Sequence, residues 1–188
     1  MNNRYVMTKK DIRESVLFLR NSLDKKEAEY ISRGICQDVI ELDFYEKATD
    51  ICLYMSINNE VYLDSLMEAS FKDGKRVWLP RVIDKHMEFY SYEANTGLLS
   101  GAFGIMEPDS KRQLVPNENT LIIMPGAVYS ENKERIGYGG GYYDKYLSEH
   151  PECHTVAVCY ELQIFPDIPT ETYDIKPEII VTEERIIE

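Results

Sequence analysis

Residues 135–147, with the sequence RIGYGGGYYDKYL, constrain the fold of this chain more than any other segment. Four of the five residues at 137–141 are glycine, and a helix-compatible run follows at once. Glycine adopts backbone conformations that other residues resist, and it lets main-chain N–H groups approach a ligand closely. The segment therefore predicts a tight loop that leads into a helix beginning near Gly141 or Tyr142.

Such a loop predicts an anion site. The free N–H groups and the dipole at the start of a helix favour negative charge, and Arg135 adds a forked, permanently charged partner for phosphate. Asp144, one turn into the helix, is placed to reach a metal ion carried by a nucleotide. The pattern predicts a magnesium nucleotide site, although glycine-rich turns that bind nothing share this spacing. It lacks both the Gly-Lys-Ser/Thr ending of a P-loop and the G-x-G-x-x-G fingerprint of dinucleotide folds.

Composition excludes several classes of protein. The 188 residues suffice for one domain with a substantial core, and the chain has neither a run of about 18 apolar residues nor a signal peptide. Its four cysteines are scattered and read as reduced thiols, which predicts a cytoplasmic location. A net charge of −12 argues against binding to nucleic acid or to anionic membranes. Nothing in the sequence compels more than a monomer.

Hydrophobic periodicity predicts a helical part at about residues 8–42 and an α/β part at about 48–187. Apolar spacing places two helices in the first part, separated near residues 21–24, and Thr8 with Asp11 resembles a capping box. We expect strands at residues 49–56, 76–82, 87–92, 120–124, 155–160 and 178–187, with helices at 61–71 and about 142–150. This alternation predicts a single α/β domain over residues 1–188, with a mostly parallel central sheet and helices on both faces, in a Rossmann-like three-layer arrangement.

Shorter motifs accompany the glycine-rich segment in a fixed order. They are Lys9 with Arg13, Glu60 and the loop before it, Leu79-Pro80-Arg81, Gly104-Ile105 with Glu107-Pro108, Met124-Pro125-Gly126, Gln163, Asp174 and Val181-Thr182-Glu183. Each motif alone is weak. Together they resemble the 5-formyltetrahydrofolate cyclo-ligase family, also called methenyltetrahydrofolate synthetase, over roughly residues 9–183.

The resemblance implies an ATP- and Mg²⁺-dependent ring closure in one-carbon metabolism. ATP would phosphorylate the formyl oxygen of 5-formyltetrahydrofolate, and nitrogen 10 of the folate would attack the activated carbon. The products would be 5,10-methenyltetrahydrofolate, ADP and phosphate. Because the substrate supplies both nucleophiles, the protein's task is alignment and charge stabilisation rather than nucleophilic catalysis.

The resemblance also implies roles for the basic residues and the glycine loop. Lys9 and Arg13, which share a helix face, would hold the phosphates of ATP; without the resemblance they would be a solvated basic stripe. Arg135 and the loop backbone would cradle phosphate and meet the formyl group during transfer. The implied ATP-binding residues are Lys9, Arg13, Arg135, Ile136, Gly137, Tyr138, Gly139, Gly140, Gly141, Tyr142 and Tyr143, and the catalytic residues are Arg135, Tyr142 and Asp144.

Acidic residues are assigned to the pterin and to the metal. Glu60 would accept the paired N–H donors of the pterin ring; the alternative is an exposed loop glutamate in a chain with 33 acidic residues. Asp144 and Asp174 would bind Mg²⁺, which usually takes one or two protein carboxylates. The implied substrate-binding residues are Met55, Glu60, Tyr138, Gly139, Gly140, Gly141 and Tyr142.

Several assignments stay open. Tyr143 is equally compatible with a core position, and Arg81 with either a ligand contact or a structural salt bridge. The chain departs from the family's usual pattern at Leu63, Ser130, Tyr173 and Glu178, which leaves the metal role of Asp174 open. Two other functions also remain: an ATP-dependent enzyme acting on another formylated or folate-like substrate, and a non-catalytic protein that binds nucleotide or folate.

Overall fold

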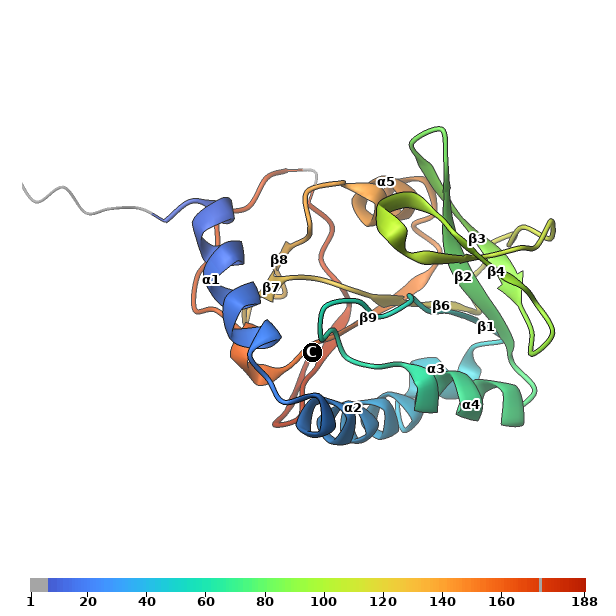
Figure 1. The fold of residues 1–188 in the computed structure, drawn as a ribbon, viewed down its shortest axis with the longest axis horizontal. Helices are drawn as coiled ribbons and strands as arrows, with labels where there is room; N and C mark the ends of the chain where they lie inside the picture. Colours follow the sequence, from blue (N-terminus) through green and yellow to red (C-terminus); the bar gives the residue numbers. More distant parts are fainter. Residues whose placement is uncertain (1–6, 173) are drawn as a thin grey trace, which may run out of the picture.

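The computed structural model describes residues 7–172 and 174–188, and a seven-stranded sheet forms its centre (Figure 1). The helices are α1 (Lys9–Asn21), α2 (Lys25–Ile40), α3 (Asp43–Lys47), α4 (Asp64–Lys72) and α5 (Tyr142–Glu149), with short 3-10 turns η1 (Ala102–Gly104) and η2 (Glu161–Gln163). The strands are β1 (Asp50–Cys52), β2 (Arg76–Ile83), β3 (His86–Tyr92), β4 (Leu98–Ser100), β5 (Met106–Pro108), β6 (Thr120–Met124), β7 (Val128–Tyr129), β8 (Arg135–Ile136), β9 (His154–Val158), β10 (Ile179–Val181) and β11 (Ile186–Ile187).

The sheet order is β11-β10-β9-β6-β1-β2-β3. The five inner strands, β10 to β2, run parallel, whereas the edge strands β3 and β11 are each antiparallel to their neighbour. Two further two-stranded sheets, β4–β5 and β7–β8, lie outside it. The mostly parallel sheet predicted from the sequence is therefore confirmed.

Helices cover both faces of the sheet, because side chains along each strand alternate between them. Figure 1 shows α2, α3 and α4 below the sheet and α5 above it. Ile51 and Ile123 belong to the cluster that includes the buried residues of α2 and α4. Cys52 and Ile122, their neighbours along the chain, belong to the second cluster, with Tyr146 of α5. The three-layer arrangement is thus confirmed.

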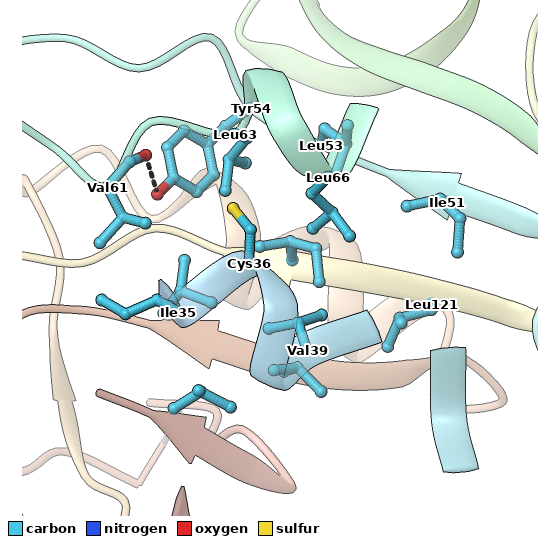
Figure 2. Packing of buried hydrophobic residues seen from close by; sticks show 14 of the residues in the cluster. Ile35, Cys36, Val39, Ile51, Leu53, Tyr54, Val61, Leu63, Leu66 and Leu121 are labelled. Carbon is cyan, nitrogen blue, oxygen red and sulfur yellow. Dashed lines mark hydrogen bonds between the residues drawn. The ribbon is translucent and has the colours of Figure 1, made fainter. Parts of the chain in front are cut away.

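The packing below the sheet also holds the loop that follows β1. Figure 2 shows Ile35, Cys36 and Val39 of α2 packed against strand and α4 side chains. In the same cluster the Tyr54 hydroxyl donates a hydrogen bond of 3.0 Å to the carbonyl of Val61. This bond spans the loop and ties its two ends together.

Helix α1 lies at the edge where the parallel strands end (Figure 1). Its buried residues Ile12 and Val16 pack with Val128 of β7 and Ile136 of β8, segments that follow β6. Thr8 and Asp11 form the expected capping box, with Thr8 N–H donating to Asp11 Oδ2 at 2.9 Å. The carboxyl ends of parallel strands are where open α/β sheets bind ligands, so α1 stands beside the expected site.

The structure corrects several element boundaries. The single strand expected at residues 178–187 is wrong: β10 and β11 form a hairpin, and the Thr182 hydroxyl accepts the N–H of Arg185 at 3.1 Å within its turn. The strand expected to continue to residue 56 ends at Cys52, and the helix expected from residue 61 begins at Asp64. The residues between them form the loop that carries Glu60.

Candidate active site

The glycine-rich loop connects β8 to α5 and requires glycine at two positions. Gly139 has φ +97° and Gly141 has φ +65°, conformations that side chains disfavour. Gly141 is the N-cap residue of α5. Because glycine has no side chain, it cannot accept a hydrogen bond from the first N–H groups of the helix. A helix start without a capping side chain is open to an anion, as the sequence predicts for this loop.

Two basic residues of α1 lie near the site: one contacts the glycine loop, and the other contacts the segment that carries Asp174. Arg13 donates from Nη1 to the carbonyl of Gly137 at 3.3 Å. Lys9, one turn earlier, contacts Asp174 Oδ2 at 2.6 Å and Glu171 Oε2 at 2.9 Å. The structure thus brings the two predicted phosphate-binding cations of α1 to the rim of the loop and to the segment of Asp174.

Arg135, in β8 just before the loop, is buried and pairs with Asp144. Its Nη2 donates to Asp144 Oδ1 at 2.7 Å, and its Nη1 donates to the carbonyl of Pro125 at 3.3 Å. The Nε of Arg135 is buried, and no acceptor for it is found in the described part of the chain. The guanidinium therefore retains one buried nitrogen, Nε, whose N–H is unused by the described residues.

The carboxylates assigned to the metal lie on adjoining segments. Ile175, next to Asp174, donates its N–H to Asp144 Oδ1 at 3.0 Å. Among residues 7–172 and 174–188, no group of three or more His, Cys, Asp and Glu side chains is placed to hold a metal. Two carboxylates, completed by phosphate oxygens and water, are however a donor set that suits Mg²⁺. Each carboxylate pairs instead with a cation, Arg135 or Lys9.

Glu60 is buried, unlike the exposed glutamate that was its alternative interpretation. Its Oε2 accepts the N–H of Ile57 at 3.0 Å, and its Oε1 accepts a hydrogen bond from the hydroxyl of Tyr138. Burial raises the pKa of the Glu60 carboxyl, and the bonds from Tyr138 and Ile57 and the charge of Arg20 oppose that rise. The glycine loop thus reaches Glu60 through the side chain of Tyr138.

Arg20 is the main feature of this site that the sequence analysis missed. Its Nη1 donates to the Tyr138 hydroxyl at 2.7 Å, and the side chain is buried. Its spacing carried the signal, because Arg20 follows Ile12 and Val16 at intervals of four and falls on their buried face. A charged residue on the apolar stripe of a helix indicates a buried polar partner.

Unpartnered buried atoms concentrate in this region. In the described residues, the buried side-chain atoms without a hydrogen-bond partner are Arg20 Nε and Nη2, Ser65 Oγ, Arg135 Nε, Tyr143 OH and Tyr146 OH. Arg20 contacts the Tyr138–Glu60 pair, and Arg135 and Tyr143 precede and follow the loop. Natural proteins leave few such atoms, and each calls for an explanation, such as a site whose ligand supplies the partner.

Four of the predicted site residues also make packing contacts within the fold. Ile136 is buried with Ile12 and Val16, so its side chain anchors the loop. Met55 packs against the lower cluster in the loop before Glu60. Tyr143 packs edge-on against Phe89, with ring centroids 6.4 Å apart. Tyr142, next to it, lines a small hollow with His86 and Lys145 on the β3 side.

None of the four departures from the family pattern falls in the glycine loop at residues 137–141. Ser130 is buried and bonds Glu134 Oε2 at 2.8 Å within the β7–β8 hairpin. Leu63 is a core residue, and Glu178 accepts the N–H of Thr155 at 2.8 Å. Tyr173 lies outside the described residues. Arg81 is 4.0 Å from Glu107, which favours the salt-bridge interpretation.

Comparisons with known proteins point in one direction. Residues 6–183 match the model of the 5-formyltetrahydrofolate cyclo-ligase family. A probable 5-formyltetrahydrofolate cyclo-ligase of Schizosaccharomyces pombe is 34% identical over 83% of this chain and 85% of its own length. The 5-formyltetrahydrofolate cyclo-ligase of Mus musculus is 29% identical over 80% of this chain and 81% of its own length.

A solved structure agrees with the sequence comparisons. The NMR structure of Aquifex aeolicus 5,10-methenyltetrahydrofolate synthetase superposes with a TM-score of 0.85 and 31% identity, covering 96% of this chain and 92% of its own. Within the described residues, no helix has the length and apolar character needed to cross a bilayer.

Proposed function

The chain belongs to the 5-formyltetrahydrofolate cyclo-ligase family, and on that premise we propose that it converts 5-formyltetrahydrofolate to 5,10-methenyltetrahydrofolate, consuming ATP and requiring Mg²⁺. One observation carries the proposal. The glycine loop contacts Arg13 through the carbonyl of Gly137 and contacts Glu60 through the hydroxyl of Tyr138. The loop proposed to bind phosphate and the carboxylate proposed to bind the pterin are thereby in direct contact.

On the nucleotide side, the loop backbone would bind phosphate together with Lys9, Arg13 and Arg135. Two of these cations hold carboxylates in the structure, Lys9 with Asp174 and Arg135 with Asp144. When a nucleotide binds, its phosphates would share these cations with the carboxylates. When bound, Mg²⁺ would neutralise charge on the transferring phosphoryl group, and Asp144 and Asp174 are the residues that would hold it.

On the folate side, Glu60 would accept the paired N–H donors of the pterin ring. The Tyr138 hydroxyl and the Ile57 N–H each donate to one oxygen of that carboxylate, and each oxygen has a second lone pair that would accept a donor of the pterin. Met55 would line the pocket next to Glu60, and Tyr142 would contact the pterin end of the folate. These contacts would set the formyl oxygen against the phosphates at the glycine loop.

The reaction would proceed in two balanced steps. The formyl oxygen attacks the terminal phosphorus of ATP, so that an O–P bond forms and the bond to ADP breaks. Nitrogen 10 then attacks the formyl carbon, the carbon–oxygen bond breaks, and phosphate leaves while nitrogen 10 loses its proton. Arg135 and the loop N–H groups would stabilise charge on the phosphoryl group in the first step and on the departing phosphate in the second.

The proposal is tested by following absorbance of the methenyl product while the protein is mixed with 5-formyltetrahydrofolate, MgCl₂ and ATP. We expect a rise in absorbance that requires both ATP and metal. No rise from folded protein that still binds ATP in a calorimetric titration would contradict the substrate assignment. That result would favour an enzyme acting on another formylated or folate-like compound.

The proposed setting of the reaction is a cytoplasmic monomer acting on small molecules. The four cysteines are all free and buried, which supports a reducing compartment. The net charge of −12 supports the absence of nucleic-acid binding. Sedimentation of the purified chain would test the monomeric state.

A further inference from the structure

Arg20 is placed unusually for a basic residue in the last turn of a helix. Its exposed fraction is 1%, whereas arginine is rarely fully buried without a paired acid. The guanidinium carbon lies 5.7 Å from the centre of the Tyr138 ring, and Nη1 donates to the Tyr138 hydroxyl at 2.7 Å. That hydroxyl donates its own proton to Glu60. The three side chains form one hydrogen-bonded chain from Arg20 to Glu60.

This arrangement is costly if its only role is stability. Among the described residues, the side chain of Arg20 bonds a hydroxyl and not a carboxylate, and its Nε and Nη2 have no acceptor. A buried guanidinium with unused donors carries a desolvation cost that an apolar residue of similar size would avoid. The charge of Arg20 is therefore better explained by its effect on its neighbours than by its own packing.

Within residues 7–172 and 174–188, the other titratable side chains found to interact with Glu60 are tyrosines, which are neutral. They come from the loop after β1, from β7, from the glycine loop and from α5, and they are Tyr54, Tyr129, Tyr138 and Tyr143. Desolvation of the hydroxyls and the charge of Glu60 raise the pKa of all four tyrosines, including Tyr138, whose residue surface is 43% exposed, so the hydroxyls stay protonated at neutral pH. Arg20 is the cation that favours the ionised form of Glu60, against the effect of burial.

We propose that Arg20 is a positioning residue of the folate site, which acts through the Tyr138 hydroxyl to keep the Glu60 carboxylate ionised and oriented. Ionisation matters because only a carboxylate accepts two N–H donors side by side, whereas a carboxylic acid carries a competing proton. The identity of the ligand rests on the proposed function. The link from Arg20 to Glu60 rests only on the contacts described above.

The first test needs no folate. Protein labelled with ¹³C at the glutamate carboxyl carbons is titrated by NMR, and the Glu60 signal is assigned by its loss in Glu60→Gln. In Arg20→Met, the titration midpoint of Glu60 should rise by about one pH unit, the change expected when a nearby cation is lost. Arg20→Lys keeps the charge, so its Glu60 midpoint should rise less than that of Arg20→Met. An unchanged midpoint in Arg20→Met would overturn the proposal.

Tyr138→Phe tests whether the hydroxyl carries the effect. This variant should also raise the Glu60 midpoint, and adding Arg20→Met to it should raise the midpoint little further. If Arg20→Met shifts the Glu60 midpoint equally in the wild type and in Tyr138→Phe, the effect does not pass through the Tyr138 hydroxyl and that part of the proposal is overturned. If Arg20→Met folds poorly in a thermal melt, the Glu60 midpoints of Tyr138→Phe and Arg20→Lys are compared with that of the wild type instead.

The second test measures affinity for 5-formyltetrahydrofolate by calorimetry between pH 6 and pH 9. Arg20→Met should bind up to about tenfold more weakly than the wild type at the acid end of this range, where more of its Glu60 is protonated, and should recover as the pH rises, since deprotonation of Glu60 restores the acceptor. Arg33→Met, the same change on the exposed face of α2, is the matched control and should match the wild type. A loss that is equal at every pH would assign Arg20 a structural role instead. If wild-type protein binds no folate, the proposed function fails while the NMR test still decides the link.

Discussion

At the scale of single residues, the two edges of the sheet treat buried charge differently. At the edge where strands begin, Asp50 accepts two bonds of 2.6 Å from Arg76 and one of 2.8 Å from Trp78. At the edge where strands end, Arg135 pairs with Asp144 but keeps a buried Nε without a partner in the described residues. A satisfied network stabilises the fold, whereas an incomplete one is typical of a binding site.

Asp50→Asn should destabilise the protein by about 1 to 3 kcal/mol, because it weakens the bonds of a buried carboxylate to Trp78 and to the half-exposed guanidinium of Arg76. Burial alone would raise the pKa of Asp50, but the bonds from Arg76, Thr49 and Trp78 lower it below its usual value. This carboxylate therefore contributes stability above about pH 4, and the contribution is lost as the pH falls through the lowered pKa.

Urea unfolding of both proteins at pH 7 and pH 3 measures the effect. The difference between wild type and Asp50→Asn should shrink at the lower pH. Asp43→Asn is the matched control, since Asp43 pairs with Lys47 on the exposed surface of α3 and should cost less than about 0.5 kcal/mol. A difference between wild type and Asp50→Asn that is independent of pH would contradict the charge-based account.

Asp144→Asn should lower kcat by about 100-fold or more and raise the Mg²⁺ concentration needed for half-maximal rate, because an amide is a weaker metal ligand and carries no charge. The amide oxygen can still accept from Arg135, so the fold should survive in a thermal melt. Asp64→Asn, in the exposed first turn of α4, is the control and should keep full activity. Normal turnover by Asp144→Asn would remove this residue from the site.

At the scale of elements, the loop between β8 and α5 needs glycine for its backbone conformation, whereas a glycine inside a helix is replaceable. Gly141 stands at φ +65° with open space around it, and Gly34 lies inside α2, also with open space. Gly141→Ala should cost about 1 to 2 kcal/mol through backbone strain and weaken ATP binding. Gly34→Ala should instead stabilise the protein by up to about 1 kcal/mol and leave ATP binding unchanged.

Thermal melts and calorimetric titration with ATP check both variants. The opposite signs matter, because a general effect of adding a methyl group would move both proteins in the same direction. Equal stability of Gly141→Ala and the wild type would mean that the left-handed conformation at this position is not needed.

The sequence predicted elements whose signals are local. Helices α1 and α2 followed from apolar spacing, and the β2–β3 hairpin followed from a turn in which Asp84 and Lys85 adopt φ of +48° and +67°. The β7–β8 hairpin escaped prediction because each strand has two residues and carries no periodicity. The same limit applied to the site: Arg20 and Tyr138 are 118 residues apart, and no local pattern joins them.

At the scale of the whole molecule, the site lies where the chain changes direction across the sheet. From β1 the chain passes through α4 to β2 on one side, and from β6 it passes through α5 to β9 on the other. The adjacent strands β1 and β6 are therefore the switch point, where open α/β sheets bind ligands. Glu60 follows β1, and the glycine loop follows β6 and the β7–β8 hairpin.

Because two ligands would meet at this point, each should stabilise the whole protein separately. At a concentration of about 100 times Kd, a ligand adds about 2.7 kcal/mol, which raises Tm by roughly 5 to 10 °C in a chain of this size. Glu60→Gln should lose the rise caused by 5-formyltetrahydrofolate and keep the rise caused by ATP, whereas Lys9→Met should do the reverse. Differential scanning fluorimetry separates the four cases. Loss of both rises in either variant would contradict separate subsites.

The position of α1 has a further consequence. The helix carries Lys9, Arg13 and Arg20 but contributes no strand, and residues 22–24 join it to α2. A chain cut at this junction would keep the whole sheet and lose all three of these cations. The larger fragment and a synthetic peptide of residues 1–22 would then form a split enzyme, in which each part is inactive alone and the mixture is active. The peptide could be replaced by one with a non-natural side chain at position 20.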